Sequence, residues 1–435
     1  MSLITKNIIG YELSAKGSET IQGFDPANLK PLPEQFSVAT EEEVALALQK
    51  ALAAWKFYRN FSGQKKGAFL KAIAEEIENL GDELVQRAAA ESGLPEGRII
   101  GERGRTCGQL RLFAQLVEEG SWVEAVIDTA QPDRTPAPKP DIRKMLASMG
   151  PVVVFTASNF PLAFSTAGGD TASALAAGCP VIVKAHESHP GTNALVASAI
   201  QKAAQKTDMP DGVFSTLYGR GNWLGQALVM HPFTKAVAFT GSHGGGKALF
   251  DLANQRAEPI PVFAEMGSVN PIFFLPEKIK NEYDDLAVQI GNSVNLGAGQ
   301  FCTNPGLLIA IDDENTTKFI GALKGVFSNL PQATMLNEGI YQNFSRRKNA
   351  MLITNGVETQ FAASEESEGH NLKAPPTVAS VTAKDFLANP NLHQEVFGPF
   401  SLLVTCKDRV EMEQVAAALH GQLTATIMGE AAEIP

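Results

Sequence analysis

One cysteine lies in a glycine-rich segment and could act as a nucleophile. Residues 297–306 read GAGQFCTNPG, with Cys302 at the sixth position. A thiolate attacks carbonyl carbon readily, and a cysteine that only fills a core seldom has neighbours that free the backbone in this way. Burial is nevertheless the common fate of an isolated cysteine. Cys302 by itself leaves both interpretations open.

The other cysteines give no sign of a metal site. Cys107, Cys179 and Cys406 lie far from Cys302 and from one another, with no Cys-x-x-Cys pair and no histidine at metal-ligand spacing. We therefore expect no bound metal. In a reducing compartment isolated cysteines remain thiols, so most of the four should be inert.

Polar residues follow short apolar runs that we expect to be strands of a parallel sheet. The runs 151–157, 181–185, 213–218, 235–240 and 260–264 alternate with helical stretches, which is typical of β-α-β units. The residues at their ends are Asn159, Lys184, Glu187, Gly241, Ser242 and Glu265. Ligands of such sheets bind beyond the carboxyl ends of the strands, so these side chains should share one edge. Singly, each is equally typical of a cap, a solvated strand end or a turn.

Two glycine-rich segments are candidates for binding phosphate. Residues 240–246 read TGSHGGG, and a helix that begins there directs backbone N–H groups toward an anion. A flexible turn is the alternative. Gly219, Gly221 and Gly225 form GxGxxxG, one residue longer than the usual dinucleotide fingerprint and therefore weak evidence.

The chain divides into regions that differ in residue composition and in the spacing of apolar residues. The first 120 residues favour helices, with a capping box at 40–43, and a further helix is predicted over 162–177. The Pro-rich, charged segment 130–149 reads as an arm that pairs with another subunit. Apolar runs at 271–275, 306–311 and 400–405 indicate a second α/β domain. We expect a doubly wound domain over 1–129 and 150–266, the arm at 130–149, and a second domain over 267–435.

Composition excludes several classes of function. The 435-residue chain has a net charge of -11 and 44% hydrophobic residues, a balance that is unsuited to nucleic-acid backbones and typical of a globular protein. It has no apolar run long enough to span a membrane and no signal-like start. We expect a cytoplasmic protein whose partners are small molecules rather than nucleic acids or membranes.

Several motifs resemble the aldehyde dehydrogenase superfamily over nearly the whole chain. Asn159, Glu265 and Cys302 occur with FTGS at 239–242 and QEVFGP at 394–399. Within the superfamily, ASNFPLAF, FAEMGSVNP and GAGQFCTNPG resemble the 2-oxoglutarate semialdehyde (2,5-dioxovalerate) dehydrogenase branch. The resemblance implies a doubly wound Rossmann-type cofactor domain, an α/β catalytic domain and a β oligomerisation arm. It also implies a homodimer or homotetramer.

The resemblance assigns a reaction to the three residues. Cys302 would add to an aldehyde, and Asn159 would stabilise the resulting oxyanion together with a backbone N–H. Loss of hydride to a nicotinamide would leave a thioester. Glu265 would then activate water to release the carboxylate. In this branch the aldehyde is 2-oxoglutarate semialdehyde and the product is 2-oxoglutarate.

Cofactor residues are also implied by the resemblance. Lys184 and Glu187 would bind the adenosine ribose and Gly241 and Ser242 the pyrophosphate; Glu395 would bind the nicotinamide ribose, with Phe397 beside the nicotinamide. A carboxylate at Glu187 accepts hydrogen bonds from ribose hydroxyls and repels a 2′-phosphate. NAD is therefore favoured. NADP remains open because Lys184 or His186 could bind a phosphate.

A carboxylate on the substrate requires a cation, and arginines occur on one predicted helix. Residues 97–114 include Arg98, Arg103, Arg105 and Arg111, and an arginine fork suits carboxylate recognition. The resemblance places Arg105 and Phe160 at the aldehyde tunnel. A solvated helix face with Arg–Glu pairs is the alternative.

Three other functions remain in view. A cysteine hydrolase would require a histidine partner for Cys302, and no histidine lies in such a motif. A fatty or broad-specificity aldehyde dehydrogenase would share every catalytic residue. The family normally continues for several dozen residues beyond the point at which this sequence ends, so we expect an incomplete catalytic domain, and an inactive cofactor-binding protein is the third alternative.

Overall fold

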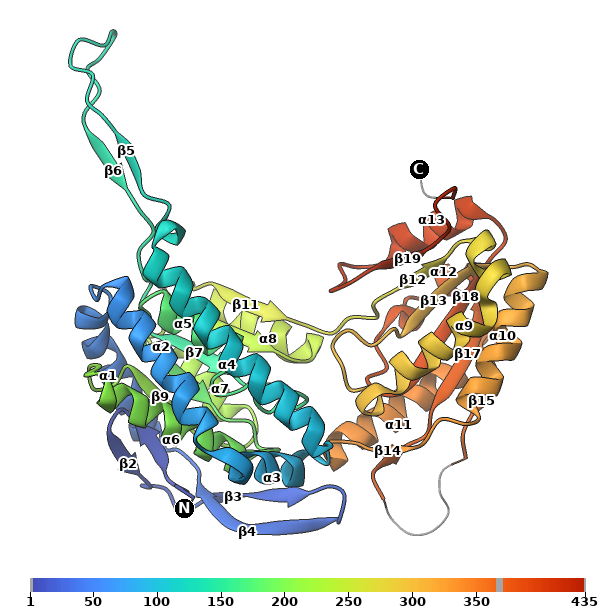
Figure 1. Ribbon diagram of the computed structural model, residues 1–435, viewed down its shortest axis with the longest axis horizontal. Helices are drawn as coiled ribbons and strands as arrows, with labels where there is room; N and C mark the ends of the chain where they lie inside the picture. The colour runs from blue at the N-terminus through green and yellow to red at the C-terminus, as the bar shows by residue number, and fades with distance from the viewer. Residues whose placement is uncertain (1–2, 365–370, 434–435) are drawn as a thin grey trace. The chain divides into compact units, whose positions relative to one another are not determined.

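The computed structural model describes residues 3–364 and 371–433. Contacts divide the chain into two compact units (Figure 1). The first unit comprises Met1–Asp25 and Lys30–Met266, and the second comprises Pro26–Leu29 and Gly267–Pro435.

A seven-stranded sheet forms the centre of the first unit, in the order β11-β10-β7-β8-β9-β1-β2. Five strands are parallel: β7 (Val152–Phe155), β8 (Val181–Lys184), β9 (Phe214–Leu217), β10 (Ala236–Thr240) and β11 (Val262–Glu265). Each coincides with a predicted apolar run, so the doubly wound α/β class is confirmed. The chain builds outward from β7 to β9 and then returns to β10 beside β7. The strand order therefore reverses between β7 and β10, the position at which such sheets bind ligands.

The remaining two strands of this sheet were not predicted. They are β1 (Asn7–Ile9) and β2 (Glu12–Ser14), which extend the sheet in antiparallel fashion beyond β9.

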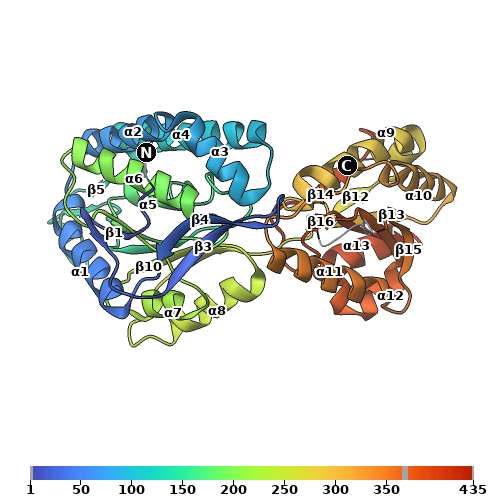
Figure 2. The ribbon, with the colours of Figure 1, turned by 90° about the horizontal axis from the view of Figure 1, so that it is seen from below.

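Helices cover both faces of this sheet, as the two ribbon views show (Figures 1 and 2). One face carries α1 (Glu41–Tyr58), α7 (Trp223–Met230) and α8 (His243–Asn254), whose apolar residues share a core with β7 and β10. The other carries α2 (Gly63–Glu78), α3 (Gly81–Ser92), α4 (Glu96–Glu119), α5 (Gly169–Ala176) and α6 (Pro190–Lys206). The predicted capping box is confirmed: Thr40 and Glu43 bond reciprocally at the start of α1.

The first 120 residues are mainly helical, as predicted, and one other prediction for the first unit was wrong. The helix-rich N-terminal region also contains the hairpin of β3 (Thr20–Asp25) and β4 (Lys30–Ser37). The helix predicted over 162–177 begins only at Gly169; residues 161–168 form turns and bends instead. The N–H groups of Leu162 and Ala163 in this stretch donate to the carboxylate of Glu102, which is remote in sequence.

A two-stranded hairpin follows α4 and the short 3₁₀ helix η1 (Ser121–Val123). It pairs β5 (Val126–Asp128) with β6 (Ile142–Lys144) in antiparallel register. The segment 130–149, predicted as an arm, contains the connecting turn and β6, while β5 precedes it. Apolar side chains on the hairpin are exposed in this single chain, Ile127 at 66%. Pairing with another subunit stays a prediction.

The second unit is built on a six-stranded sheet in the order β15-β17-β18-β13-β12-β19. Its strands are β12 (Ile272–Phe274), β13 (Leu307–Ile311), β15 (Glu358–Ala362), β17 (Thr377–Thr382), β18 (Phe400–Cys406) and β19 (Thr426–Met428), all parallel to their neighbours except β15. A short ribbon pairs β14 (Ala333–Thr334) with β16 (Lys373–Ala374).

Helices again cover both faces of the second sheet. One core contains residues of α9 (Pro276–Asn295) and α10 (Glu314–Phe327), and the other contains residues of α11 (Glu338–Leu352), α12 (Ala383–Ala388) and α13 (Arg409–Ala418). The 3₁₀ helices η2 (Leu296–Gly299) and η3 (Pro390–His393) precede the two segments that carry Cys302 and Glu395.

Candidate active site

Asn159 lies in an irregular loop, residues 156–168, between β7 and α5. The side chain of Asn159 is partly exposed, and its backbone carbonyl accepts a hydrogen bond from Nη2 of Arg98 at 3.0 Å. Two residues earlier, the Ala157 carbonyl is 2.9 Å from Nε2 of His189. Side chains from α4 and from the start of α6 thus satisfy backbone groups that no strand or helix satisfies.

Helix α4 supplies charged side chains to this loop. Oε1 of Glu102 accepts the N–H groups of Leu162 and Ala163 at 2.8 and 2.9 Å, and Nη2 of Arg98 lies 3.8 Å from Oε2 of Glu102. Burial raises the pKa of Glu102, although both N–H donors and Arg98 act in the opposite direction. The hydrogen bonds that Glu102 accepts therefore offset the cost of burying its carboxylate.

The predicted substrate residues Arg105 and Phe160 lie together at this loop. The guanidinium of Arg105 is 5.7 Å from the ring centre of Phe160 and 5.0 Å from the ring centre of Phe164. The guanidinium of Arg98 is 4.7 Å from the ring centre of Phe160. Phe160 is buried, and Arg105 is exposed.

The other two arginines of α4 are engaged elsewhere. Arg103 donates to the Gly81 carbonyl, and Arg111 forms two bonds to the carboxylate of Glu78. The solvated Arg–Glu interpretation therefore describes Arg111, remains open for the exposed Arg105, and does not describe the largely buried Arg98.

Glu265 is the last residue of β11, paired in register with Thr240 of β10, and is partly exposed. Its backbone carbonyl accepts the Gly241 N–H at 3.0 Å. Asp170, in the first turn of α5, has a pKa raised to about 6, mainly by burial and further by the charge of Glu265. No motif in the sequence singles out Asp170, because the fold alone brings it within reach of the charge of Glu265.

Two residues predicted to bind the adenosine ribose lie at the end of β8. Glu187 is exposed, and burial lowers the pKa of Lys184 while the charge of Glu187 raises it. Between them, His186 stacks on His189 with ring centres 5.5 Å apart. Burial, together with the charges of His189 and Lys184, holds the pKa of His186 well below its usual value. His186 is therefore neutral at neutral pH and adds no cation for a phosphate.

The start of α8 has the properties of an anion site. Ser242 is its N-cap and accepts the Gly245 N–H at 3.2 Å. Gly241, Ser242 and Gly244 are exposed, and a Cβ at Gly244 would meet nothing within 4 Å. Because α8 follows β10 at the point of strand reversal, its N-terminal N–H groups suit a pyrophosphate.

One glycine of the weaker motif has a packing role. Gly225 lies inside α7, and a Cβ there would come within 3.0 Å of the Phe155 ring.

In the second unit, Cys302 lies in a tight bend after α9. Gly297, Ala298 and Gly299 have positive φ values of 57°, 57° and 66°. A Cβ at Gly299 would lie 2.2 Å from the carbonyl carbon and oxygen of Gly398. Two glycines and one strained alanine therefore let the bend approach the backbone before β18.

Two asparagines hold this bend. Nδ2 of Asn270 donates to the carbonyls of Cys302 and Asn304 at 2.9 and 2.8 Å, and Nδ2 of Asn304 donates to the Gly398 carbonyl at 3.1 Å. Cys302 is partly exposed, whereas the other three cysteines are buried. The segment FAEMGSVNP contains Asn270, but no pattern within it indicated a bond across the fold.

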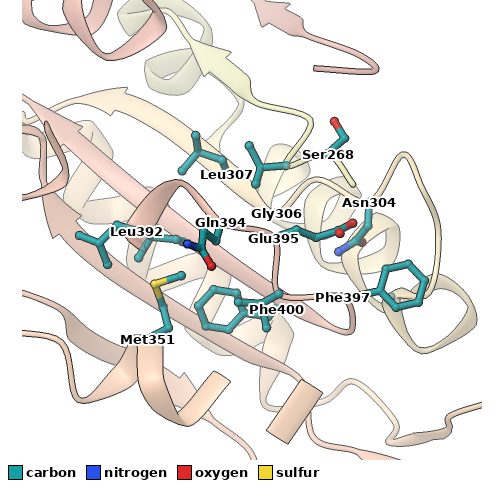
Figure 3. Close-up of a pocket in the computed structure, with 14 residues that line it drawn as sticks. Ser268, Asn304, Gly306, Leu307, Met351, Leu392, Gln394, Glu395, Phe397 and Phe400 are labelled. Carbon is teal, nitrogen blue, oxygen red and sulfur yellow. The ribbon is translucent and has the colours of Figure 1, made fainter. Parts of the chain in front are cut away.

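Glu395 and Phe397, predicted to bind the nicotinamide end, line a small cavity with Ser268, Gly299 and Asn304. Figure 3 shows these polar groups and Phe397 toward one end of the cavity, with Met351 and Leu392 toward the other. Burial raises the pKa of Glu395 to about 7, opposed by the Ser268 N–H and the charge of Arg347. The second unit thus brings Glu395 and Phe397 beside the bend that carries Cys302.

Within the first unit, the predicted residues Asn159, Lys184, Glu187, Gly241, Ser242 and Glu265 lie at or just beyond the carboxyl ends of parallel strands, with Arg105 and Phe160 at the Asn159 loop. Among residues 3–364 and 371–433 no three metal-binding side chains gather into a candidate site. Within the same ranges, none of the helices combines the length and hydrophobicity needed to cross a bilayer.

Comparison with known proteins decides the family. The model of the aldehyde dehydrogenase family matches residues 13–433. The chain belongs to the aldehyde dehydrogenase family. Membership confirms the predicted enzyme class, the oxidation of an aldehyde to a carboxylic acid, and removes the cysteine hydrolase alternative.

Relatives of this aldehyde dehydrogenase span its full length. It is 48% identical to alpha-ketoglutaric semialdehyde dehydrogenase 2 of Azospirillum brasilense, covering 100% of this chain and 83% of that protein. It is 42% identical to alpha-ketoglutaric semialdehyde dehydrogenase of Acinetobacter baylyi, covering 99% and 81%.

Solved structures show the same fold at lower identity. A NAD-dependent benzaldehyde dehydrogenase from Corynebacterium glutamicum has a TM-score of 0.81 at 22% identity, covering 99% of this chain and 90% of that one. A NAD-dependent aldehyde dehydrogenase from Sinorhizobium meliloti has a TM-score of 0.83 at 22% identity, covering 98% and 83%.

Proposed function

We propose that this aldehyde dehydrogenase oxidises 2-oxoglutarate semialdehyde to 2-oxoglutarate with NAD, through a thiohemiacetal and then a thioester on Cys302. The observation that carries the proposal is the bend around Cys302, which holds the backbone of a partly exposed thiol with three positive φ angles and the amide of Asn270. The proposed substrate is supported by two alpha-ketoglutaric semialdehyde dehydrogenases that are 48% and 42% identical to this chain. Alpha-ketoglutaric semialdehyde is another name for 2-oxoglutarate semialdehyde.

Each proposed catalytic residue has one chemical task. The Cys302 thiolate forms a carbon–sulfur bond with the aldehyde carbon, and the carbonyl oxygen becomes an oxyanion. The Asn159 side-chain amide and the Cys302 N–H donate hydrogen bonds to that oxyanion. Bound nicotinamide dinucleotide supplies the acceptor for the hydride that leaves the adduct. Glu265 then removes a proton from water, which attacks the thioester and releases the carboxylate and Cys302.

The residues present fit a nicotinamide dinucleotide. The exposed N-terminus of α8 with Ser242 and Gly241 suits the pyrophosphate. Lys184 and Glu187 would hold the adenosine ribose, and Glu395 and Phe397 the nicotinamide end. The exposed carboxylate of Glu187 would repel a 2′-phosphate, and His186 is neutral, so NAD is preferred over NADP. Lys184 is the one residue here that favours NADP.

Arg105 is our proposed partner for the substrate carboxylate. Of the four arginines on α4, Arg103 and Arg111 bond to Gly81 and Glu78, and Arg98 bonds to the Asn159 backbone. Arg105 is exposed beside Phe160, which would pack against the aliphatic part of the substrate. A guanidinium fork binds a carboxylate through two parallel bonds.

Steady-state kinetics of the purified chain test this function. NAD and NADP are each assayed against 2-oxoglutarate semialdehyde, succinic semialdehyde and a long-chain aldehyde. We expect the highest kcat/KM with NAD and 2-oxoglutarate semialdehyde. Arg105→Ala should raise the KM for that substrate, with Arg111→Ala as the matched control. A higher kcat/KM for the long-chain aldehyde would favour the fatty aldehyde alternative, and cofactor binding without turnover would mean a cofactor-binding protein.

Two finer parts of the proposal rest on the sequence. We propose a cytoplasmic location, and a homodimer or homotetramer in which the β5–β6 hairpin pairs with a second copy. The exposed apolar side chains of the hairpin support the second point. Light scattering during size-exclusion chromatography measures the assembly directly, and a monomer would exclude it.

A further inference from the structure

The loop that carries Asn159 has irregular backbone, and charged side chains of helix α4 bind part of it. Arg98 donates to the Asn159 carbonyl at 3.0 Å. Glu102 accepts the N–H groups of Leu162 and Ala163 at 2.8 and 2.9 Å. Helix α4 therefore determines the path of the loop on the C-terminal side of Asn159.

The Arg98 bond restricts the orientation of Asn159 itself. A carbonyl oxygen lies in the plane of its peptide bond, so a donor that holds the oxygen of Asn159 holds the whole 159–160 peptide. The same guanidinium lies 4.7 Å from the ring centre of Phe160, the second residue of that peptide. This bond restricts the peptide that follows the Cα of Asn159, and on the preceding side the Ala157 carbonyl lies 2.9 Å from Nε2 of His189. The two anchors together restrict the backbone from which the Asn159 side chain extends.

Burial indicates that the pair serves the loop. The side chains of Arg98 and Glu102 are 17% and 3% exposed, and their closest charged atoms are 3.8 Å apart. Desolvating two charges is unfavourable unless further hydrogen bonds satisfy them. Arg111 of the same helix instead pairs with Glu78 of α2 at 2.6 Å, and this pair remains at the surface with side chains 42% and 44% exposed. Nη2 of Arg98 and Oε1 of Glu102 obtain their additional bonds from the backbone of residues 159–163.

We propose that Arg98 and Glu102 are positioning residues that orient the side-chain amide of Asn159 toward the oxyanion. This inference rests on the oxyanion role proposed for Asn159. It makes Arg98 part of the chemical step through Asn159 and leaves recognition of the substrate carboxylate to Arg105. Loss of Arg98 should therefore slow thioester formation without weakening substrate binding.

A double-mutant cycle on the full chain tests the proposal. Arg98→Met, Asn159→Ala and the double variant are compared by the burst rate of NADH formation from 2-oxoglutarate semialdehyde, which reports thioester formation. An oxyanion donor contributes about 10²–10³-fold, so we expect Asn159→Ala to slow the burst by about that factor and Arg98→Met by about tenfold or more. In the Asn159→Ala background, Arg98→Met should change the burst rate by less than about twofold. The KM for the aldehyde should stay within about twofold throughout.

Controls separate this role from general structure. Arg111→Met should retain the wild-type burst rate, and Arg98→Lys, which keeps one cationic donor, should recover part of it. If Arg98→Met does not fold, Arg98→Lys and Glu102→Gln enter the cycle in its place.

Three results would overturn the assignments, each in a different way. Equal effects of Arg98→Met in both backgrounds would show that Arg98 does not act through Asn159. A raised KM with an unchanged burst rate would make Arg98 a substrate-binding residue. An unchanged burst rate in Asn159→Ala would remove the proposed oxyanion role itself, independently of Arg98.

Discussion

The loop of Asn159 and the bend of Cys302 are both held in an irregular backbone conformation, but by different interactions. Both are irregular segments proposed to carry catalytic groups. Buried charges on α4, a helix some 60 residues away in sequence, hold part of the loop backbone, and His189 at the start of α6 lies 2.9 Å from the Ala157 carbonyl. The bend is held by its own positive φ angles, by close contact with Gly398, and by neutral amides of Asn270 and Asn304.

The difference has an energetic consequence. Buried charges are sensitive to any change that removes a partner, whereas a bend packed backbone against backbone is sensitive to added volume. Substitutions that change charge should therefore alter the stability of the loop most. Substitutions that add volume, or that exchange a hydrogen-bond donor for an acceptor, should alter the stability of the bend most.

The largest effect is expected when volume is added to the bend. Gly299→Ala places a methyl group 2.2 Å from the Gly398 carbonyl group at a φ of 66°, so the bend or the neighbouring segment must move. We expect the free energy of unfolding to fall by about 3 kcal/mol or more and activity to fall by at least about 100-fold. Denaturant unfolding and steady-state rates measure the two.

Gly306→Ala is the matched control at the other end of the same segment. A Cβ at Gly306 would meet its nearest atoms at 3.5 Å, an ordinary contact. This variant should lie within about 1 kcal/mol of wild type. If both glycine variants behave alike, the bend is not held by close backbone approach.

A change of donor to acceptor should have the next largest effect. Asn270→Asp is nearly isosteric, but it replaces the Nδ2 that donates to Cys302 and Asn304 by a carboxylate oxygen facing two carbonyls. We expect a loss of about 2–5 kcal/mol of stability at neutral pH, less at low pH where the carboxyl can be protonated. Asn292→Asp, an exposed site on α9, is the control. Equal loss in both variants would mean that charge alone matters.

The sequence predicted the parts of this molecule that follow local rules. Buried parallel strands appear as continuous apolar runs, so β7 to β11 were located, and the Thr40–Glu43 box located the start of α1. Family resemblance then assigned roles to Cys302, Asn159 and Glu265. Those three roles stay predictions until they are measured.

The supports of these residues could not be predicted from sequence. Glu102 contacts the loop across 60 positions and Asn270 reaches Cys302 across 32, and neither lies in a pattern that signals its partner. A helix was also expected at 162–168, where local propensity favours one, but the structure has turns and bends there. Long-range bonds of single side chains leave no periodic trace in the sequence.

At the loop, Glu102→Gln tests whether the charge of Glu102 or only its acceptor oxygen is needed. We expect a smaller change in stability than for Asn270→Asp in the bend. Burial raises the pKa of Glu102, so its contribution to folding is greatest below the ordinary carboxyl pKa and is lost as pH rises through the raised value. A neutral amide avoids that penalty and keeps one acceptor oxygen. We expect Glu102→Gln to lose no more than about 1 kcal/mol at neutral pH, and Glu102→Ala, which leaves two N–H groups unbonded, to lose about 2–4 kcal/mol. Equal losses in thermal unfolding would mean that the carboxylate charge itself is required.

The smallest effect concerns Glu395, the titrating neighbour of the bend. Its pKa of about 7 means that the carboxyl is neutral below that pH and a hydrogen-bond acceptor for ribose hydroxyls above it. NAD should therefore bind a few-fold more tightly as pH rises from about 6 to about 8. Stability should change in the opposite direction, because a group whose pKa is raised in the folded state stabilises the fold at low pH and loses that contribution as pH rises through about 7.

Glu395→Gln separates this titration from that of other groups. The variant should flatten both pH profiles, measured by fluorescence titration with NADH and by thermal unfolding, whereas Glu338→Gln, at an exposed site on α11, should leave both unchanged. If affinity and stability rise together with pH in the wild type, another group controls one of them. If Glu395→Gln retains the wild-type affinity profile, Glu395 does not contact the cofactor. The bend would then depend on neutral groups alone, and its contrast with the charged loop of Asn159 would be sharper than proposed.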